Sequence, residues 1–323
     1  MDITLKSGEV SAKIVSKGAE LKSLTVGKRE LMWSADPAFW GKTSPLLFPM
    51  IGTLKDGKTT INGKEYKITK HGFARDLEFT PEDFNGSSAM FSLTQNDYTK
   101  AMYPFDFKFT VRYTLKADGI TVTYRVRNDS DAEMPFCIGA HPAFATPGDM
   151  NGYRLQFLRP ETAAVPNYNL ETGLHEEHNR RELMKDSTDL QLSHEMFYED
   201  VCYFDKVASR QVELLNSENT GVRVDTRISQ ALAYGRRRTL RSFALSHGAV
   251  PRTSTTAPAY LLRNEESKYS LQVPKRHSLM QSRQLNIKRK YKKNPPAQTG
   301  GFFLCKQPPV KGGCMYQICS SRY

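Results

Sequence analysis

The sequence lacks any apolar run of 18 residues, the length that a membrane-spanning helix needs. Cysteine is also scarce, with 5 in 323 residues. Cys137 and Cys202 lie in apolar, strand-like surroundings, which is typical of buried free thiols in a reducing compartment. Cys305, Cys314 and Cys319 have neither CxxC spacing nor a partner histidine, so they do not predict a zinc site. These absences argue against a helical membrane span and against a disulfide framework.

Acidic residues are nearly missing from the end of the chain. Thr226–Tyr323 contains 19 Lys/Arg residues and only 2 Asp/Glu residues. Met1–Asp225 contains 27 Lys/Arg residues and 32 Asp/Glu residues. The net charge of +12 therefore belongs wholly to this tail. Its basic run Lys288–Lys293 would suit nucleic acid or anionic lipid if the tail is a genuine appendage. Because the rest of the chain is acidic, the bulk charge does not predict a nucleic-acid partner.

Period-two alternation of apolar residues dominates Met1–Asp225. Apolar residues occupy every second position over Phe105–Leu115 and again from Ile120 to Val126, on either side of an Asp-Gly turn, which predicts a long antiparallel hairpin. Asn62–Gly63 predicts a second hairpin. Shorter strands are expected at Ile3–Leu5, Ala12–Val15, Glu20–Val26, Ala89–Leu93, Tyr153–Phe157 and Gln211–Leu215, and single helical turns at Asp97–Tyr103 and Glu176–Met184. Many strands with frequent turns favour an all-β, large antiparallel sandwich.

Three clusters interrupt this alternation and are candidates for a site. In the segment 40–52 (WGKTSPLLFPMIG), the aromatic Phe48 could stack on the apolar face of a sugar ring, or the segment could be a buried corner. In the segment 70–76 (KHGFARD), His71 and Arg75 at the end of a strand suit hydroxyls or a phosphate. His141, in the segment 134–144 (MPFCIGAHPAF), is either a core histidine or a proton donor with a pKa near neutrality. Asp205 is a weaker acidic candidate that also suits a turn.

These stretches resemble the aldose 1-epimerase (galactose mutarotase-like) superfamily, in particular its bacterial LacX-like branch. The matching segments run in family order: 18–24 (GAELKSL), 31–33, 39–52, 71–75 (HGFAR) and 139–144 (GAHPAF). The resemblance implies a sugar cleft across a concave sheet and an enzyme that interconverts α and β anomers of an aldose. It implies His141 as the general acid, His71 as a hydrogen-bonding partner of the sugar or its ring oxygen, and Arg75 as a ligand of a hydroxyl or a phosphate. Phe48 and Asp205 are added as substrate-binding candidates from the residues alone. It implies no metal or organic cofactor.

The family's catalytic glutamate has no counterpart in the sequence as written. Reverse translation of Thr226–Gly248 in the next reading frame permits PDFPGFGLWSPPDAPFVCIEPW, and this string resembles the family's last segment. We therefore hypothesise a one-frame slip near codon 226, with FALSHG at 243–248 standing where CIEPW would be. On this hypothesis, residues 1–225 form a truncated mutarotase-like domain, 226–323 form an irregular basic tail, and activity is impaired.

Two other function classes remain open on sequence alone. The chain could be a non-catalytic carbohydrate-binding protein on the same scaffold, or a β-domain whose basic tail binds RNA or a membrane. Met1-Asp2-Ile3 leads directly into an alternating strand, so no signal peptide and a cytoplasmic location are expected. The favoured partner is a small sugar or sugar phosphate, with neither a membrane nor a nucleic acid.

Overall fold

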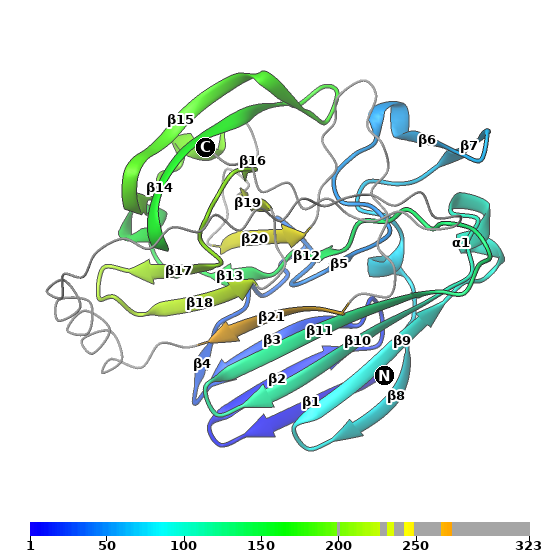
Figure 1. Ribbon diagram of the computed structural model, residues 1–323. Helices are drawn as coiled ribbons and strands as arrows, with labels where there is room; N and C mark the ends of the chain where they lie inside the picture. Colours follow the sequence, from blue (N-terminus) through cyan, green and yellow to red (C-terminus); the bar gives the residue numbers. More distant parts are fainter. Residues whose placement is uncertain (199–200, 227–230, 236–241, 249–265, 273–323) are drawn as a thin grey trace, which may run out of the picture.

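Figure 1 shows the computed structural model of the protein, which describes residues 1–198, 201–226, 231–235, 242–248 and 266–272. Strands make up most of these residues, and the all-β prediction is confirmed. The first sheet has the order β1 (Asp2–Ser7), β2 (Val10–Val15), β3 (Glu20–Val26) and β4 (Arg29–Glu30). It lies beside the β8–β11 strands in Figure 1, and Lys6 donates a backbone hydrogen bond of 2.8 Å to the Gly86 carbonyl.

The largest sheet is antiparallel along its whole order, β15-β14-β17-β18-β21-β11-β10-β9-β8. Its strands are β8 (Thr80–Asn85), β9 (Ser88–Thr94), β10 (Phe107–Lys116), β11 (Gly119–Asn128), β14 (Tyr153–Asn169), β15 (Leu174–Gln191), β17 (Gln211–Asn216), β18 (Gly221–Thr226) and β21 (Glu266–Gln272). β21 joins its two halves, because it pairs with β18 on one side and with β11 on the other.

A third sheet carries the short strands around the candidate site, in the order β16-β19-β20-β12-β5, with β13 also paired to β20. Its strands are β5 (Leu46–Leu47), β12 (Gly139–Ala140), β13 (Ala143–Ala145), β16 (Val201–Phe204), β19 (Ala231–Gly235) and β20 (Ser242–Gly248). The remaining elements are the hairpin β6 (Lys58–Ile61) and β7 (Lys64–Lys67), helix α1 (Asp97–Met102) and the 3-10 turns η1 (Lys55–Gly57), η2 (Ala74–Asp76), η3 (Met150–Gly152) and η4 (Glu195–Phe197).

The predicted hairpin of β10 and β11 supplies the centre of the core. Buried and half-buried residues alternate along β10 from Phe107 to Leu115, which places one face of the strand against the interior. One apolar cluster includes side chains from all three larger sheets, among them Ile3, Phe109 and Phe204. The sheets therefore share a single core, as expected for a sandwich.

Two expectations differ from the structure. Glu176–Met184 is not a helical turn, because it lies within the long strand β15, which pairs with β14 through several bulges. The tail Thr226–Tyr323 is not irregular throughout, because it contains β19, β20 and β21, which pair with open edges of earlier strands. The rest of that tail is outside the described residues. No helix in the described part of the chain is long and apolar enough to cross a membrane.

Candidate functional site

His141 occupies the short connection between β12 and β13. Its backbone N–H donates to the Pro45 carbonyl at 3.0 Å, which ties the connection to the segment before β5. The Trp40 ring lies against the imidazole, with ring centroids 4.9 Å apart. The Nδ1 atom of His141 is buried and has no hydrogen-bond partner among the described residues. A buried ring nitrogen without a partner is unusual in a structural histidine, since buried polar atoms are normally paired.

His71 lies in a tight turn after β7, with its ring facing that of His141. The centroids of the two imidazoles are 6.1 Å apart in an edge-to-face arrangement. The backbone N–H of Gly52 donates to His71 Nδ1 at 3.0 Å, and the His71 N–H donates to the Gly52 carbonyl at 2.9 Å. Because Nδ1 accepts a hydrogen bond, the proton of the neutral ring is on Nε2. The backbone of Gly52 thereby fixes both the position and the tautomer of His71.

Burial and nearby cations keep both imidazoles neutral. Burial lowers the pKa of His71 to about 3, with further lowering from the charges of His141, Arg75 and Lys70. Burial also lowers the pKa of His141 to about 4, again with contributions from Arg75 and Lys70. No carboxylate acts on the pKa of either ring within the described part of the chain. Two neutral, adjacent imidazoles next to the cations of Arg75 and Lys70 form a polar group that suits hydroxyls.

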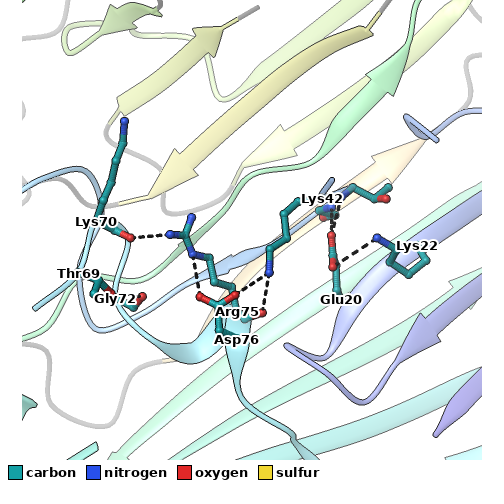
Figure 2. Close-up of polar contacts among 10 residues, drawn as sticks. Glu20, Lys22, Lys42, Thr69, Lys70, Gly72, Arg75 and Asp76 are labelled. Carbon is teal, nitrogen blue, oxygen red and sulfur yellow. Dashed lines mark hydrogen bonds and ion pairs between the residues drawn. The ribbon is translucent and has the colours of Figure 1, made fainter. Parts of the chain in front are cut away.

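Arg75 is held beside this pair by the turn that also carries His71. Its Nη2 donates to the Lys70 carbonyl at 2.9 Å, and its Nε lies 3.4 Å from a carboxylate oxygen of Asp76 (Figure 2). Lys42, from the segment that also contains Trp40, donates to the other Asp76 oxygen at 2.7 Å. The structure thus brings together three predicted features: His141, His71 and Arg75.

The segment before β5 is anchored by a buried carboxylate. Glu20 is 6% exposed, and its Oε1 accepts the backbone N–H groups of Thr43 and Ser44 at 2.5 and 2.9 Å. Its Oε2 lies 3.5 Å from Lys22 Nζ, as Figure 2 also shows. These bonds fix the main chain next to Lys42 and so help to position the wall of the site.

Asp205 lies at the end of β16, within a second polar group formed by the β14–β15 hairpin. Its carboxylate pairs with Arg180 of β15, and its charge opposes the burial that lowers the pKa of His175 to about 4. The His175 ring stacks on Tyr203, with centroids 4.6 Å apart. This group approaches the histidine pair through Tyr168 of β14, whose hydroxyl accepts a 3.3 Å hydrogen bond from Lys70.

Phe48 does not belong to the site surface. Its side chain is 0% exposed and packs among aromatic rings of the core, including Phe73, Tyr103 and Phe109. A ring without exposed area has no free face for a sugar, so its expected stacking role is corrected to core packing. Its backbone still matters to the site, because its carbonyl accepts the N–H groups of Phe73 and Ala74 in the turn after His71.

Sequence reasoning did not identify Lys42 and Asp76 as a pair, since 34 positions separate them and neither lies in a periodic pattern. Within the described residues, no group of three or more His, Cys, Asp or Glu side chains is arranged to hold a metal ion. The chemistry that the described side chains offer here is hydrogen bonding and proton transfer by imidazole.

The fold is a large antiparallel β-sandwich, and comparison with known proteins identifies the family to which it belongs. The family model for aldose 1-epimerase matches residues 1–233. The plasmid and chromosomal LacX proteins of Lactococcus lactis subsp. lactis are each 32% identical over 237 residues, which cover 70% of this chain and 79% of theirs. The chain belongs to the aldose 1-epimerase family.

Solved structures show the same architecture. A galactose mutarotase related enzyme from Lactobacillus acidophilus matches with a TM-score of 0.79 and 25% identity, over 85% of this chain and 98% of that one. A galactose mutarotase-like protein from Lactobacillus casei matches with a TM-score of 0.76 and 24% identity, over 84% and 99% of the two chains. A putative aldose 1-epimerase from Escherichia coli K12 shares the fold at 16% identity, with a TM-score of 0.69 over 85% and 99%.

Proposed function

We propose that the protein is an aldose 1-epimerase-type isomerase that interconverts the α and β anomers of an aldohexose or hexose phosphate. The observation that carries this proposal is the edge-to-face pair of His71 and His141. Their ring centroids are 6.1 Å apart, and burial and the charge of Arg75 lower the pKa of both rings. Such a pair can bind the ring oxygen and adjacent hydroxyls of a sugar at the same time. Family membership supports the same function.

In the proposed reaction, His141 donates a proton to the ring oxygen while a base removes the proton of the C1 hydroxyl. The bond between C1 and the ring oxygen breaks, giving the open-chain aldehyde. Rotation about the C1–C2 bond and closure with the reverse proton transfers yield the other anomer. His71 and Arg75 bind the sugar in this scheme, and Asp205 binds a more distant hydroxyl.

The chain as written has no catalytic base in the segment where the family's glutamate is expected, residues 243–248. In the shifted reading frame, the glutamate of CIEPW is encoded across the codons of Leu245 and Ser246. The backbone pairings Ala140 with His247 and Ala143 with Ala244 place these two codon positions opposite His141–Pro142. A glutamate restored there would lie on the strand next to the general acid, which supports the frame-slip hypothesis.

Impaired activity of the chain as written follows from the same reasoning. A histidine with a pKa of about 4 is protonated in only about one molecule in a thousand at pH 7. A neighbouring carboxylate would raise the pKa of His141 and also accept the C1 proton. Without it, the site keeps its sugar-binding groups and loses most of its acid–base capacity, so a non-catalytic carbohydrate-binding role is the second candidate.

Proton NMR exchange spectroscopy with galactose, glucose and glucose 6-phosphate tests these functions, with saturation-transfer experiments to detect binding. Anomer exchange above the buffer rate that His141→Asn abolishes supports the enzyme. Binding without faster exchange supports the non-catalytic role. A chain that neither binds a sugar nor accelerates its exchange contradicts both. A cytoplasmic location is part of the proposal, and fractionation of the producing cells would test it.

A further inference from the structure

The guanidinium of Arg75 is held by one hydrogen bond and one ion pair. Nη2 donates to the Lys70 carbonyl at 2.9 Å, and Nε lies 3.4 Å from Asp76 Oδ2. Nε is buried and makes no hydrogen bond to the described residues, so its contact with Asp76 is an ion pair alone, and the side chain is 25% exposed. Arginine uses parallel N–H groups to bind oxygen acceptors, so the N–H groups of Arg75 that make no hydrogen bond within the protein are the ones available to a ligand.

Asp76 connects this guanidinium to a lysine from another segment. One carboxylate oxygen faces Arg75 Nε, and the other accepts from Lys42 Nζ at 2.7 Å. The same Lys42 ammonium donates to the Arg75 main-chain carbonyl at 3.2 Å. Figure 2 shows this chain of contacts from Lys42 through Asp76 to Arg75 and on to Lys70. Lys42 therefore links the 40–45 segment to both the backbone and the side chain of the arginine turn.

The charge balance of this group requires the carboxylate to stay ionised. Burial acts to raise the pKa of Asp76, but hydrogen bonds and charges from Lys42 and Arg75 lower it below its ordinary value. An ionised Asp76 between two cations offsets their mutual repulsion. Loss of the carboxylate would leave Arg75 tied only to a neutral carbonyl on its own turn, and loss of Lys42 would leave Asp76 without the partner that ties it to the 40–45 segment.

From these contacts we infer that Lys42 and Asp76 are positioning residues that hold the Arg75 guanidinium in place for the sugar proposed to bind at His71 and His141. This inference rests on the proposed function for its ligand, while the positioning itself concerns the protein alone. Lys42 and Asp76 touch Arg75 rather than the sugar, so their effect is on affinity through the orientation of one guanidinium.

The test uses the full chain with Lys42→Met, Lys42→Arg and Asp76→Asn. Asp2→Asn is the matched control, because its ion pair with Lys13 is 2.8 Å long and its side chain is 54% exposed, against 2.7 Å and 55% for Asp76 with Lys42. We expect Lys42→Met and Asp76→Asn to weaken galactose binding about fivefold to tenfold, as for loss of a typical hydrogen bond. Lys42→Arg should restore most of the affinity, and Asp2→Asn should change nothing.

A second readout makes the inference independent of the sugar. The heteronuclear NOE of the Arg75 Nε–H signal should fall in Lys42→Met and Asp76→Asn and recover in Lys42→Arg. Unchanged sugar affinity in a chain that binds sugar, or an unchanged NOE, would overturn the positioning role. A parent chain that binds no sugar while its NOE responds as expected would contradict the proposed function and leave the positioning intact. Thermal melting of each variant identifies any loss of affinity that arises from unfolding.

Discussion

The β9–β11 strands and the turn that carries His71 are held by different means. Along β10, buried and half-buried side chains alternate, and this strand pairs in an unbroken register with both of its neighbours, β9 and β11. The turn at residues 69–76 has no periodic pattern and is positioned by backbone contacts to residues 48–52 and by ion pairs to Lys42. Many side chains and a continuous ladder share in holding the sheet, whereas the turn depends on a close main-chain approach that one added atom at Gly72 would disrupt.

The largest effect should come from an added methyl group at Gly72. A Cβ there would lie 2.1 Å from the Phe48 carbonyl oxygen, and its φ of +71° is strained for any other residue. We expect Gly72→Ala to cost more than about 3 kcal/mol in the free energy of unfolding, measured with urea.

Gly27→Ala separates the clash from the strain, because Gly27 has a φ of +57° and an added Cβ there would meet no atom within 4 Å. This control should cost only about 1 kcal/mol. Equal losses in the two variants would show that close approach to Phe48 does not govern the turn.

Glu20→Ala should have the next largest effect. It leaves the backbone N–H groups of Thr43 and Ser44 buried without their acceptor, at a cost of about 2–3 kcal/mol. Glu20→Gln keeps an acceptor oxygen and should retain most of the stability. If thermal melting shows the alanine and glutamine variants to be alike, the carboxylate does not anchor this segment.

The smallest effect, about 1 kcal/mol per histidine and pH unit, is a pH dependence to which the two imidazoles of the site contribute, together with His175 of β15, whose pKa burial also lowers to about 4. The pKa values of His71 and His141 are about 3 and about 4, below the value of 6.5 in an unfolded chain. Between pH 6.5 and about 4, the unfolded chain therefore binds protons that the folded chain does not, and the free energy of unfolding falls as the pH falls.

Replacement of one of these histidines tests this origin. His141→Asn should flatten the slope of the unfolding free energy near pH 5 by about 1 kcal/mol per pH unit. Urea titrations at several pH values would measure it. A slope that does not change would place the pH dependence elsewhere in the molecule.

The periodic parts of the molecule could be predicted well from the sequence, and the site in part. Period-two alternation locates the β10–β11 hairpin, and Asn62–Gly63 locates the turn of the β6–β7 hairpin. The prediction of a helical turn at Glu176–Met184 is wrong because a polar strand with one partner and several bulges has no clear period. The local sequence pattern does not reveal the pairing of this strand with β14.

The same limit explains the partial prediction of the site. His71, Arg75 and His141 stand out because their residue types carry chemistry in recognisable motifs. The sugar-stacking role of Phe48 is wrong because exposure cannot be read from the sequence, and this ring is fully buried. The pairing of Lys42 with Asp76 depends on the approach of two irregular segments, which no spacing encodes.

The central claim is that this chain holds a sugar-epimerase site whose general acid is present and whose base is encoded in the other frame. The most direct test compares anomer exchange of galactose by the chain as written and by a chain with the frame restored after codon 226. We predict that restoration accelerates exchange at least about 100-fold, the usual contribution of a positioned acid or base. Equal exchange rates in the two chains would contradict the claim.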